Sequence, residues 1–292
     1  MAEIGILSPA QLADQLGSPD LVILDGSYYL PALRRDADAE YRERRIPGAL
    51  RFDIDAVKDT TSNLPHMLPT PEAFAAAAGA LGIGNDTLVV AYDGLGLMSA
   101  ARVAWTFRTF GAERVAILDG GFPAWLAEGR PVETGPPRSP QPRSFTPRFD
   151  AGAVADLDRV RQALATGSAQ VVDARSAARF TGEEAEPRAG TRSGHMPGAF
   201  NLHYGSIVKD GRLADTETIE AAVREAGIDP DRPIVTTCGS GVTAAILSMA
   251  FERIGRPAQA LYDGSWSEWG ARDDTPVETG PARPGVKSAG TA

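Results

Sequence analysis

The sequence predicts an α/β protein with two tandem domains, each a parallel sheet flanked by helices on both faces. Short β-rich runs alternate with helical periods along the chain, which is typical of such sheets. The same pattern occurs twice: Asp119 and Trp125 reappear as Asp263 and Trp269, each 144 positions further on. A period near half the chain length is too long for a solenoid repeat, so it indicates a duplicated domain.

The ends of the two repeats set the expected boundaries. Each half closes with Val-Glu-Thr-Gly, at 132–135 and 277–280, and Ile46-Pro-Gly-Ala49 is echoed by Met196-Pro-Gly-Ala199. The stretch from Arg130 to Pro147 holds six prolines, as a stiff linker does. We therefore expect an N-terminal domain over 1–130, a proline-rich linker over 131–150, a C-terminal domain over 151–280 and a disordered tail over 281–292.

The elements of the second half follow from hydrophobic periodicity. Residues 170–173 and 234–237 are apolar, β-branched runs that predict strands. Between them we expect a helix that begins near Thr216, with Asp215 as its N-cap, and ends at Gly227. Its buried face is predicted to be Ile219, Ala222, Val223 and Ala226. The helix after the second strand should bury Val242, Ala245, Ile246, Met249 and Ala250, and stop at Gly255 and Pro257.

Charge and hydropathy exclude several classes of partner. Lysine and arginine total 29 against 38 aspartates and glutamates, a net charge of −9. This balance argues against nucleic acid or an acidic membrane as the main partner. No apolar run approaches the roughly 18 residues that span a bilayer, and the first residues lack the regions of a secretory signal. We therefore expect a cytoplasmic protein with no membrane or nucleic-acid partner.

Cysteine and histidine, the usual metal ligands, are scarce. Cys238 is the single cysteine, so an internal disulfide and a CxxC site are excluded. The histidines are His66, His195 and His203, with no HExxH motif. A structural zinc site is effectively excluded, and we expect neither a metal nor a cofactor. His195, within Gly-His-Met-Pro-Gly, is interpreted as a structural turn residue.

Cys238 is the strongest candidate for chemistry. It lies at the carboxyl end of a predicted strand, where ligands bind in open α/β sheets. The glycines of the following loop let successive N–H groups form an anion-binding nest at a helix N-terminus, which stabilises a thiolate. A lone cysteine is more often a small buried hydrophobe, but this position predicts a nucleophile. The loop residues expected to bind substrate are Gly239, Gly241, Val242 and Thr243.

The first repeat carries Asp93 where the second carries Cys238. Asp93-Gly-Leu-Gly-Leu-Met98 has one residue inserted before its helix. An aspartate in a nest cannot perform thiol chemistry, so we expect the first domain to be non-catalytic. Its Gly94-x-Gly96 predicts a turn rather than a dinucleotide site.

These motifs resemble the tandem-domain rhodanese family, and within it the branch of 3-mercaptopyruvate sulfurtransferases. The resemblance runs from about residue 7 to residue 280. Its most specific part is Cys238-Gly-Ser-Gly-Val-Thr-Ala244, because thiosulfate-preferring relatives usually place basic residues directly after the cysteine. Supporting motifs lie at 62–69, 194–199 and 262–269.

The resemblance implies a sulfur transfer through Cys238. The thiolate takes sulfur from 3-mercaptopyruvate as a persulfide and releases pyruvate; a thiol, cyanide or a reduced thioredoxin-like protein then accepts the sulfur. Two substrate arginines fall on Arg179 and Arg188, whose guanidinium groups suit a carboxylate and a keto oxygen. A proposed relay falls on Ser240, His66 and Asp55, the last two in the first half of the chain.

Three other functions are alternatives to this one. Thiosulfate sulfurtransferase is the alternative within the enzyme class. A cysteine phosphatase needs an arginine six residues after the cysteine, where this chain has Ala244. A non-catalytic rhodanese-like module that only binds partners is disfavoured because Cys238, Ser240 and both arginines are present.

Overall fold

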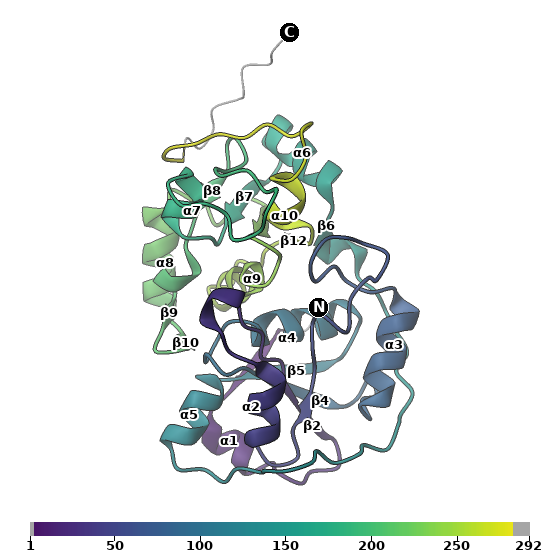
Figure 1. Ribbon diagram of the computed structural model, residues 1–292. Coiled ribbons are helices and arrows are strands. Elements are labelled where there is room, and N and C mark those ends of the chain that lie inside the picture. Colours follow the sequence, from purple (N-terminus) through teal and green to yellow (C-terminus); the bar gives the residue numbers. More distant parts are fainter. Residues whose placement is uncertain (1–2, 283–292) are drawn as a thin grey trace. The chain divides into compact units, whose positions relative to one another are not determined.

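The computed structural model describes residues 3–282, and in it the chain divides into two compact units (Figure 1). The first unit takes the chain up to residue 61, residues 68–150 and residues 210–213. The second takes residues 62–67, 151–209 and 214 onward. His66, which lies in the first half of the sequence, therefore belongs to the second unit. Residues 283–292 of the expected tail lie outside the described residues.

The first unit holds a five-stranded parallel sheet in the order β1-β5-β4-β2-β3. Helix α4 packs against β4 and β5, and α5 packs against β5. The elements are β1 (Gly5–Leu7), α1 (Pro9–Ala13), β2 (Leu21–Asp25), η1 (Pro31–Leu33), α2 (Ala37–Glu43), β3 (Leu50–Arg51), α3 (Pro71–Ala80), β4 (Leu88–Tyr92), α4 (Ala100–Thr109), β5 (Arg114–Leu118) and α5 (Gly121–Ala127).

The second unit repeats this plan, with the sheet order β6-β12-β11-β7-β8 and parallel pairing throughout. Its elements are η2 (Ala151–Ala153), β6 (Val154–Ala155), α6 (Leu157–Thr166), β7 (Gln170–Asp173), α7 (Ala177–Thr181), β8 (Phe200–Asn201), η3 (Tyr204–Ser206), α8 (Thr216–Glu225), β11 (Ile234–Thr237), α9 (Ala244–Arg253), β12 (Ala260–Tyr262) and α10 (Ser265–Trp269). The second unit also holds β9 (Val208–Lys209), whereas β10 (Arg212–Leu213) belongs to the first unit. The predicted fold class, two parallel sheets flanked by helices, is confirmed.

The elements expected in the second half lie where periodicity placed them. The two strands match β7 and β11, and α8 begins at Thr216 with the Asp215 carboxylate accepting from the Thr218 N–H at 2.8 Å. Ile219 and Val223 are buried, whereas Ala222 and Ala226 of the predicted buried face are half-buried. Val242 also differs: it is buried but lies in the turn before α9, which begins at Ala244.

The repeated sequence motifs close each unit in the same way. Glu133 forms an antiparallel bridge with Arg45, and Glu278 forms one with His195. A buried tryptophan then fixes the returning chain: the indole N–H of Trp125 donates to the Pro131 carbonyl and that of Trp269 to the Pro276 carbonyl, both at 2.8 Å. These contacts give the Val-Glu-Thr-Gly motif a structural function.

No helix within residues 3–282 combines the length and the apolar character needed to cross a bilayer.

Gly121 offers a test of the packing at the end of the first sheet. Its φ is +56°, and an added Cβ would lie 2.5 Å from the Asp93 carbonyl oxygen. Gly129 has a similar φ of +64° with open space around it. We expect Gly129→Ala to cost about 1–2 kcal/mol of stability from the left-handed backbone alone, and Gly121→Ala about 1–3 kcal/mol more from overpacking. Denaturant unfolding measures both, and equal losses would contradict the predicted clash.

Candidate functional site

Cys238 directly follows β11, the central strand of the second sheet, and its side chain is buried. Its carbonyl accepts from the Trp266 N–H at 2.9 Å, and its own N–H donates to the Ser265 hydroxyl at 3.3 Å. After the cysteine the chain turns sharply, with Gly241 at φ +79°, and enters α9 at Ala244. Cys238 therefore stands at the start of the turn that leads into the N-terminus of α9, the end of a helix at which backbone N–H groups gather.

The corresponding loop of the first unit already holds an anion. The Asp93 carboxylate accepts from the backbone N–H groups of Leu95, Met98 and Ala100, each at 2.8 Å. Such a constellation of backbone donors is an anion-binding nest. The loop after the central strand can therefore hold negative charge with backbone groups alone, and in the first unit Asp93 supplies it.

Arg179, on α7, reaches the loop of the cysteine. A Cβ added at Gly239 would lie 2.9 Å from Arg179 Nη2, so the guanidinium lies directly against this glycine. Glu186 holds it there, accepting from Nη2 at 2.5 Å and from Nε at 3.2 Å. The loop itself contains no basic residue, but α7 brings a cation beside it. The Arg179 side chain keeps 19% of its surface exposed, and a ligand can reach that part.

Beneath Arg179 lies a buried ion network that the sequence did not reveal. Arg175 contacts both Asp173 and Glu186 at 2.7 Å, and its guanidinium lies 4.4 Å from the centre of the Trp266 ring. Burial alone would lower the pKa of Arg175, but the attraction of Asp173 and Glu186 outweighs it and raises the pKa above its ordinary value. Glu186 thus joins two arginines. The repeat of Val172-Asp173 and the charge-rich run 183–188 were the available signals.

Arg188 and His66 meet within the second unit. Arg188 Nη2 lies 3.5 Å from His66 Nε2, and the His66 backbone has a left-handed φ of +57°. His66 is buried and Arg188 is half-buried. The structure therefore brings together two of the predicted site residues that are 122 positions apart in the chain.

The other predicted residues divide between the units. Ser240 is half-buried on the loop, two positions after the cysteine, whereas Asp55 is exposed in the first unit and pairs with Lys58 at 3.3 Å. The participation of Asp55 in a relay stays a prediction. His195 is fully buried and stacks on Phe180 with ring centres 3.9 Å apart, and burial lowers its pKa.

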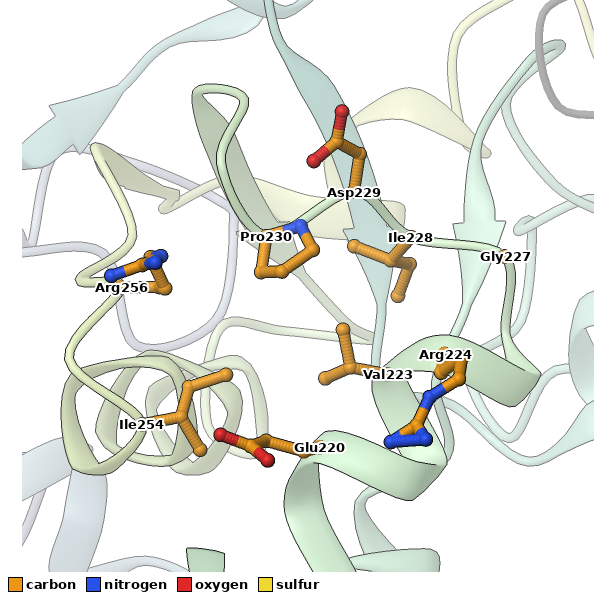
Figure 2. Close-up of a pocket in the computed structure, with 9 residues that line it drawn as sticks. All are labelled: Glu220, Val223, Arg224, Gly227, Ile228, Asp229, Pro230, Ile254 and Arg256. Carbon is orange, nitrogen blue, oxygen red and sulfur yellow. The ribbon is translucent and has the colours of Figure 1, made fainter. Parts of the chain in front are cut away.

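A pocket of about 430 Å³ opens at the other end of the second sheet (Figure 2). The residues from Gly227 to Pro230 precede β11, so the pocket lies at the amino end of the strand that Cys238 follows. Figure 2 shows charged side chains, among them Glu220 and Arg224, around apolar ones such as Ile254. No predicted site residue lines it. Within residues 3–282, no cluster of three or more histidine, cysteine or acidic side chains is arranged to hold a metal ion.

Known proteins are similar to this chain along nearly its whole length. The model of the rhodanese-like domain matches twice, at residues 8–128 and 156–272. The 3-mercaptopyruvate sulfurtransferase of Escherichia coli K12 is 43% identical over 268 residues, 91% of this chain and 95% of that protein. Thiosulfate/3-mercaptopyruvate sulfurtransferase 1 of Arabidopsis thaliana is 41% identical over 94% of this chain and 78% of its own length. The crystal structure of SseA from Escherichia coli, described as a 3-mercaptopyruvate sulfotransferase, superposes with a TM-score of 0.82 at 39% identity, covering 90% of this chain and 99% of that one.

Removing the charge of Arg175 should destabilise the fold strongly. Arg175→Met leaves Asp173 and Glu186 buried without their shared cation, and breaking a buried ion pair typically costs about 3–5 kcal/mol. Arg256→Met, which removes an exposed ion pair with Asp231, is the matched control and should cost at most about 1 kcal/mol. Denaturant unfolding compares the two, and an Arg175 variant no weaker than the control would refute the structural importance of the network.

Proposed function

The chain belongs to the rhodanese family, and from this premise we propose that it is a 3-mercaptopyruvate sulfurtransferase that works through a persulfide on Cys238. The observation that carries the proposal is the position of the single cysteine at the end of the central strand, in a loop whose counterpart binds a carboxylate through three N–H groups. Relatives that are 41–43% identical over most of the chain bear this activity in their names.

In the proposed first step, the Cys238 thiolate attacks the thiol sulfur of 3-mercaptopyruvate. A sulfur–sulfur bond forms while the carbon–sulfur bond breaks, and its electron pair passes to carbon as the enolate of pyruvate. The proton of the donor thiol ends on that carbon, so pyruvate leaves and a persulfide anion remains. Backbone N–H groups of the loop from Gly239 to Ala244 stabilise the negative charge on sulfur, as their counterparts do for Asp93.

The two arginines would recognise the acidic end of the donor. Arg179 is already paired with Glu186, which reduces its net attraction for an anion. Arg188 lies against an imidazole rather than a carboxylate, so more of its charge is available. We therefore assign the donor carboxylate mainly to Arg188 and the keto oxygen to Arg179.

His66 and Ser240 would handle protons. His66 Nε2 faces Arg188, so the imidazole lies beside the proposed position of the donor carboxylate. Ser240 would donate to the developing enolate, with Asp55 as the third member of the relay. An acceptor of the class of small thiols, cyanide or a reduced thioredoxin-like protein then attacks the outer sulfur and regenerates the Cys238 thiolate. The cytoplasm, which keeps an unpaired cysteine reduced, is the proposed compartment.

Thiosulfate is the alternative donor. The loop sequence after Cys238, which has no basic residue, argues against thiosulfate, but the position of Arg179 favours it. Thiosulfate is a compact dianion whose charge must be neutralised close to the attacking sulfur. The Arg179 guanidinium beside Gly239 supplies a positive charge at that position, although Glu186 offsets it.

Cys238 should carry the transferred sulfur. Incubation with 3-mercaptopyruvate in the absence of an acceptor should add the mass of one sulfur atom, which dithiothreitol removes. Mass spectrometry of the intact protein measures the change. Cys238→Ser should gain no mass and should not turn over; a serine variant that still transfers sulfur would disprove the proposed nucleophile.

Arg188→Ala should lower kcat/KM for 3-mercaptopyruvate by roughly 10- to 100-fold, the equivalent of the about 1.5–3 kcal/mol of a charged hydrogen bond. Arg179→Ala should have a smaller effect because its charge is shared with Glu186. Arg188→Lys is the matched control that keeps the charge but loses the two-pronged geometry, and it should fall between the wild type and Arg188→Ala. Steady-state kinetics in which both alanine variants match the wild type would show that neither arginine binds the donor.

The ratio of kcat/KM for the two donors decides between the two candidate activities. We expect a preference for 3-mercaptopyruvate, because the loop from Gly239 to Thr243 contains no basic residue and Arg179 is partly neutralised. Both donors are assayed side by side with cyanide as acceptor. A preference for thiosulfate would make the protein a thiosulfate sulfurtransferase.

A further inference from the structure

The turn that begins α10 makes four hydrogen bonds to the segment Cys238–Gly239. Two involve Cys238: its N–H donates to the Ser265 hydroxyl at 3.3 Å, and its carbonyl accepts from the Trp266 N–H at 2.9 Å. The other two converge on the Gly239 carbonyl, which accepts from the Ser267 N–H at 2.8 Å and from the Ser267 hydroxyl at 2.6 Å. Two serines thus make three of the four hydrogen bonds that hold this segment, and the Trp266 N–H makes the fourth.

Ser265 adopts a backbone conformation that a serine normally avoids. Its φ is +49°, in the left-handed region, where the Cβ meets the backbone. The residue is fully buried, and its hydroxyl donates to the Tyr262 carbonyl at 2.8 Å while it accepts from Cys238 and from the Thr237 hydroxyl. Strained residues of this kind persist where the surroundings hold them, and they gather at functional sites.

The first unit provides an internal comparison. Its equivalent turn has Gly121 and Pro123 in place of Ser265 and Ser267, and Gly121 has a similar φ of +56° without a side chain. Proline has no N–H to donate. One of the four hydrogen bonds has a counterpart there, from the Phe122 N–H to the Asp93 carbonyl at 3.0 Å. The fold can therefore make this turn without either serine.

We propose that Ser265 and Ser267 are positioning residues for the reaction at Cys238, which deepens the proposed function and rests on it. Neither hydroxyl touches the donor. Together they fix the Cys238–Gly239 peptide, so that the sulfur stays in line with the donor and the loop N–H groups stay aimed at the charge that develops on it. Loss of either hydroxyl lets this peptide rotate and misplaces the nucleophile.

Ser265→Gly and Ser267→Ala test the proposal in the full chain. Ser265→Gly relieves the left-handed strain and Ser267→Ala keeps the backbone N–H, so both variants should fold. With 3-mercaptopyruvate we expect kcat to fall at least tenfold while KM stays within threefold. Alkylation of Cys238 by iodoacetamide should become at least threefold faster, because the released loop exposes a buried thiol. Ser267→Thr keeps the hydroxyl and should retain kcat within threefold.

Ser248→Ala is the matched control. This serine is also buried in the second unit, where its hydroxyl donates to the Ala244 carbonyl at 3.3 Å and shares a hydrogen bond with the Thr236 hydroxyl at 2.9 Å; neither partner belongs to the segment Cys238–Gly239. The proposal is overturned if both test variants keep kcat within twofold of the wild type, or if Ser248→Ala loses as much. A wild type that is inactive with 3-mercaptopyruvate would instead refute the proposed function. In that case the alkylation rates decide: acceleration in the two variants supports the positioning role, and unchanged rates overturn it.

Discussion

One backbone hydrogen bond recurs at the carboxyl end of the central strand in both units, and the site depends on it. The carbonyl of the residue after the strand accepts a hydrogen bond from an N–H group in the turn that follows the neighbouring strand. The Asp93 carbonyl accepts from the Phe122 N–H at 3.0 Å, and the Cys238 carbonyl accepts from the Trp266 N–H at 2.9 Å. Because main-chain atoms make this bond, the side chain that follows the strand is free to vary. The same loop can therefore present a carboxylate in one unit and a thiol in the other.

The two units differ in how they manage charge at this position. In the first, the Asp93 carboxylate fills its own nest and satisfies the loop N–H groups from within. In the second, Cys238 takes the position of Asp93, the Arg179 guanidinium lies beside Gly239, and we propose that the loop serves an external anion. The Glu186 carboxylate connects Arg175 in the core to Arg179 at the loop and so fixes the position of Arg179. Buried Arg175 thus holds, through Glu186, the half-buried Arg179 in place.

Local patterns predicted much of the fold and part of the site. The repeat indicated two parallel sheets, and the apolar spacing around Ile219 located α8 because both signals are local. Features that depend on where distant segments meet had no local sequence pattern to predict them. Examples are the pairing of Arg175 with Asp173 and Glu186 and the left-handed φ of Ser265. Chain spacing offered no reason to group His66 with Arg188, because the short segment 62–67 joins the second unit against chain order; only the family resemblance placed both in one site.

We propose that the loop after β11 holds a sulfur-borne negative charge with its backbone, as the loop of Asp93 holds a carboxylate. A crystal structure of the protein soaked with 3-mercaptopyruvate, in the absence of an acceptor, tests it most directly. We expect an additional sulfur atom bonded to the Cys238 sulfur, within hydrogen-bond distance of two or more N–H groups between Gly239 and Ala244. An outer sulfur that points away from the loop, with no backbone N–H in reach, would contradict it.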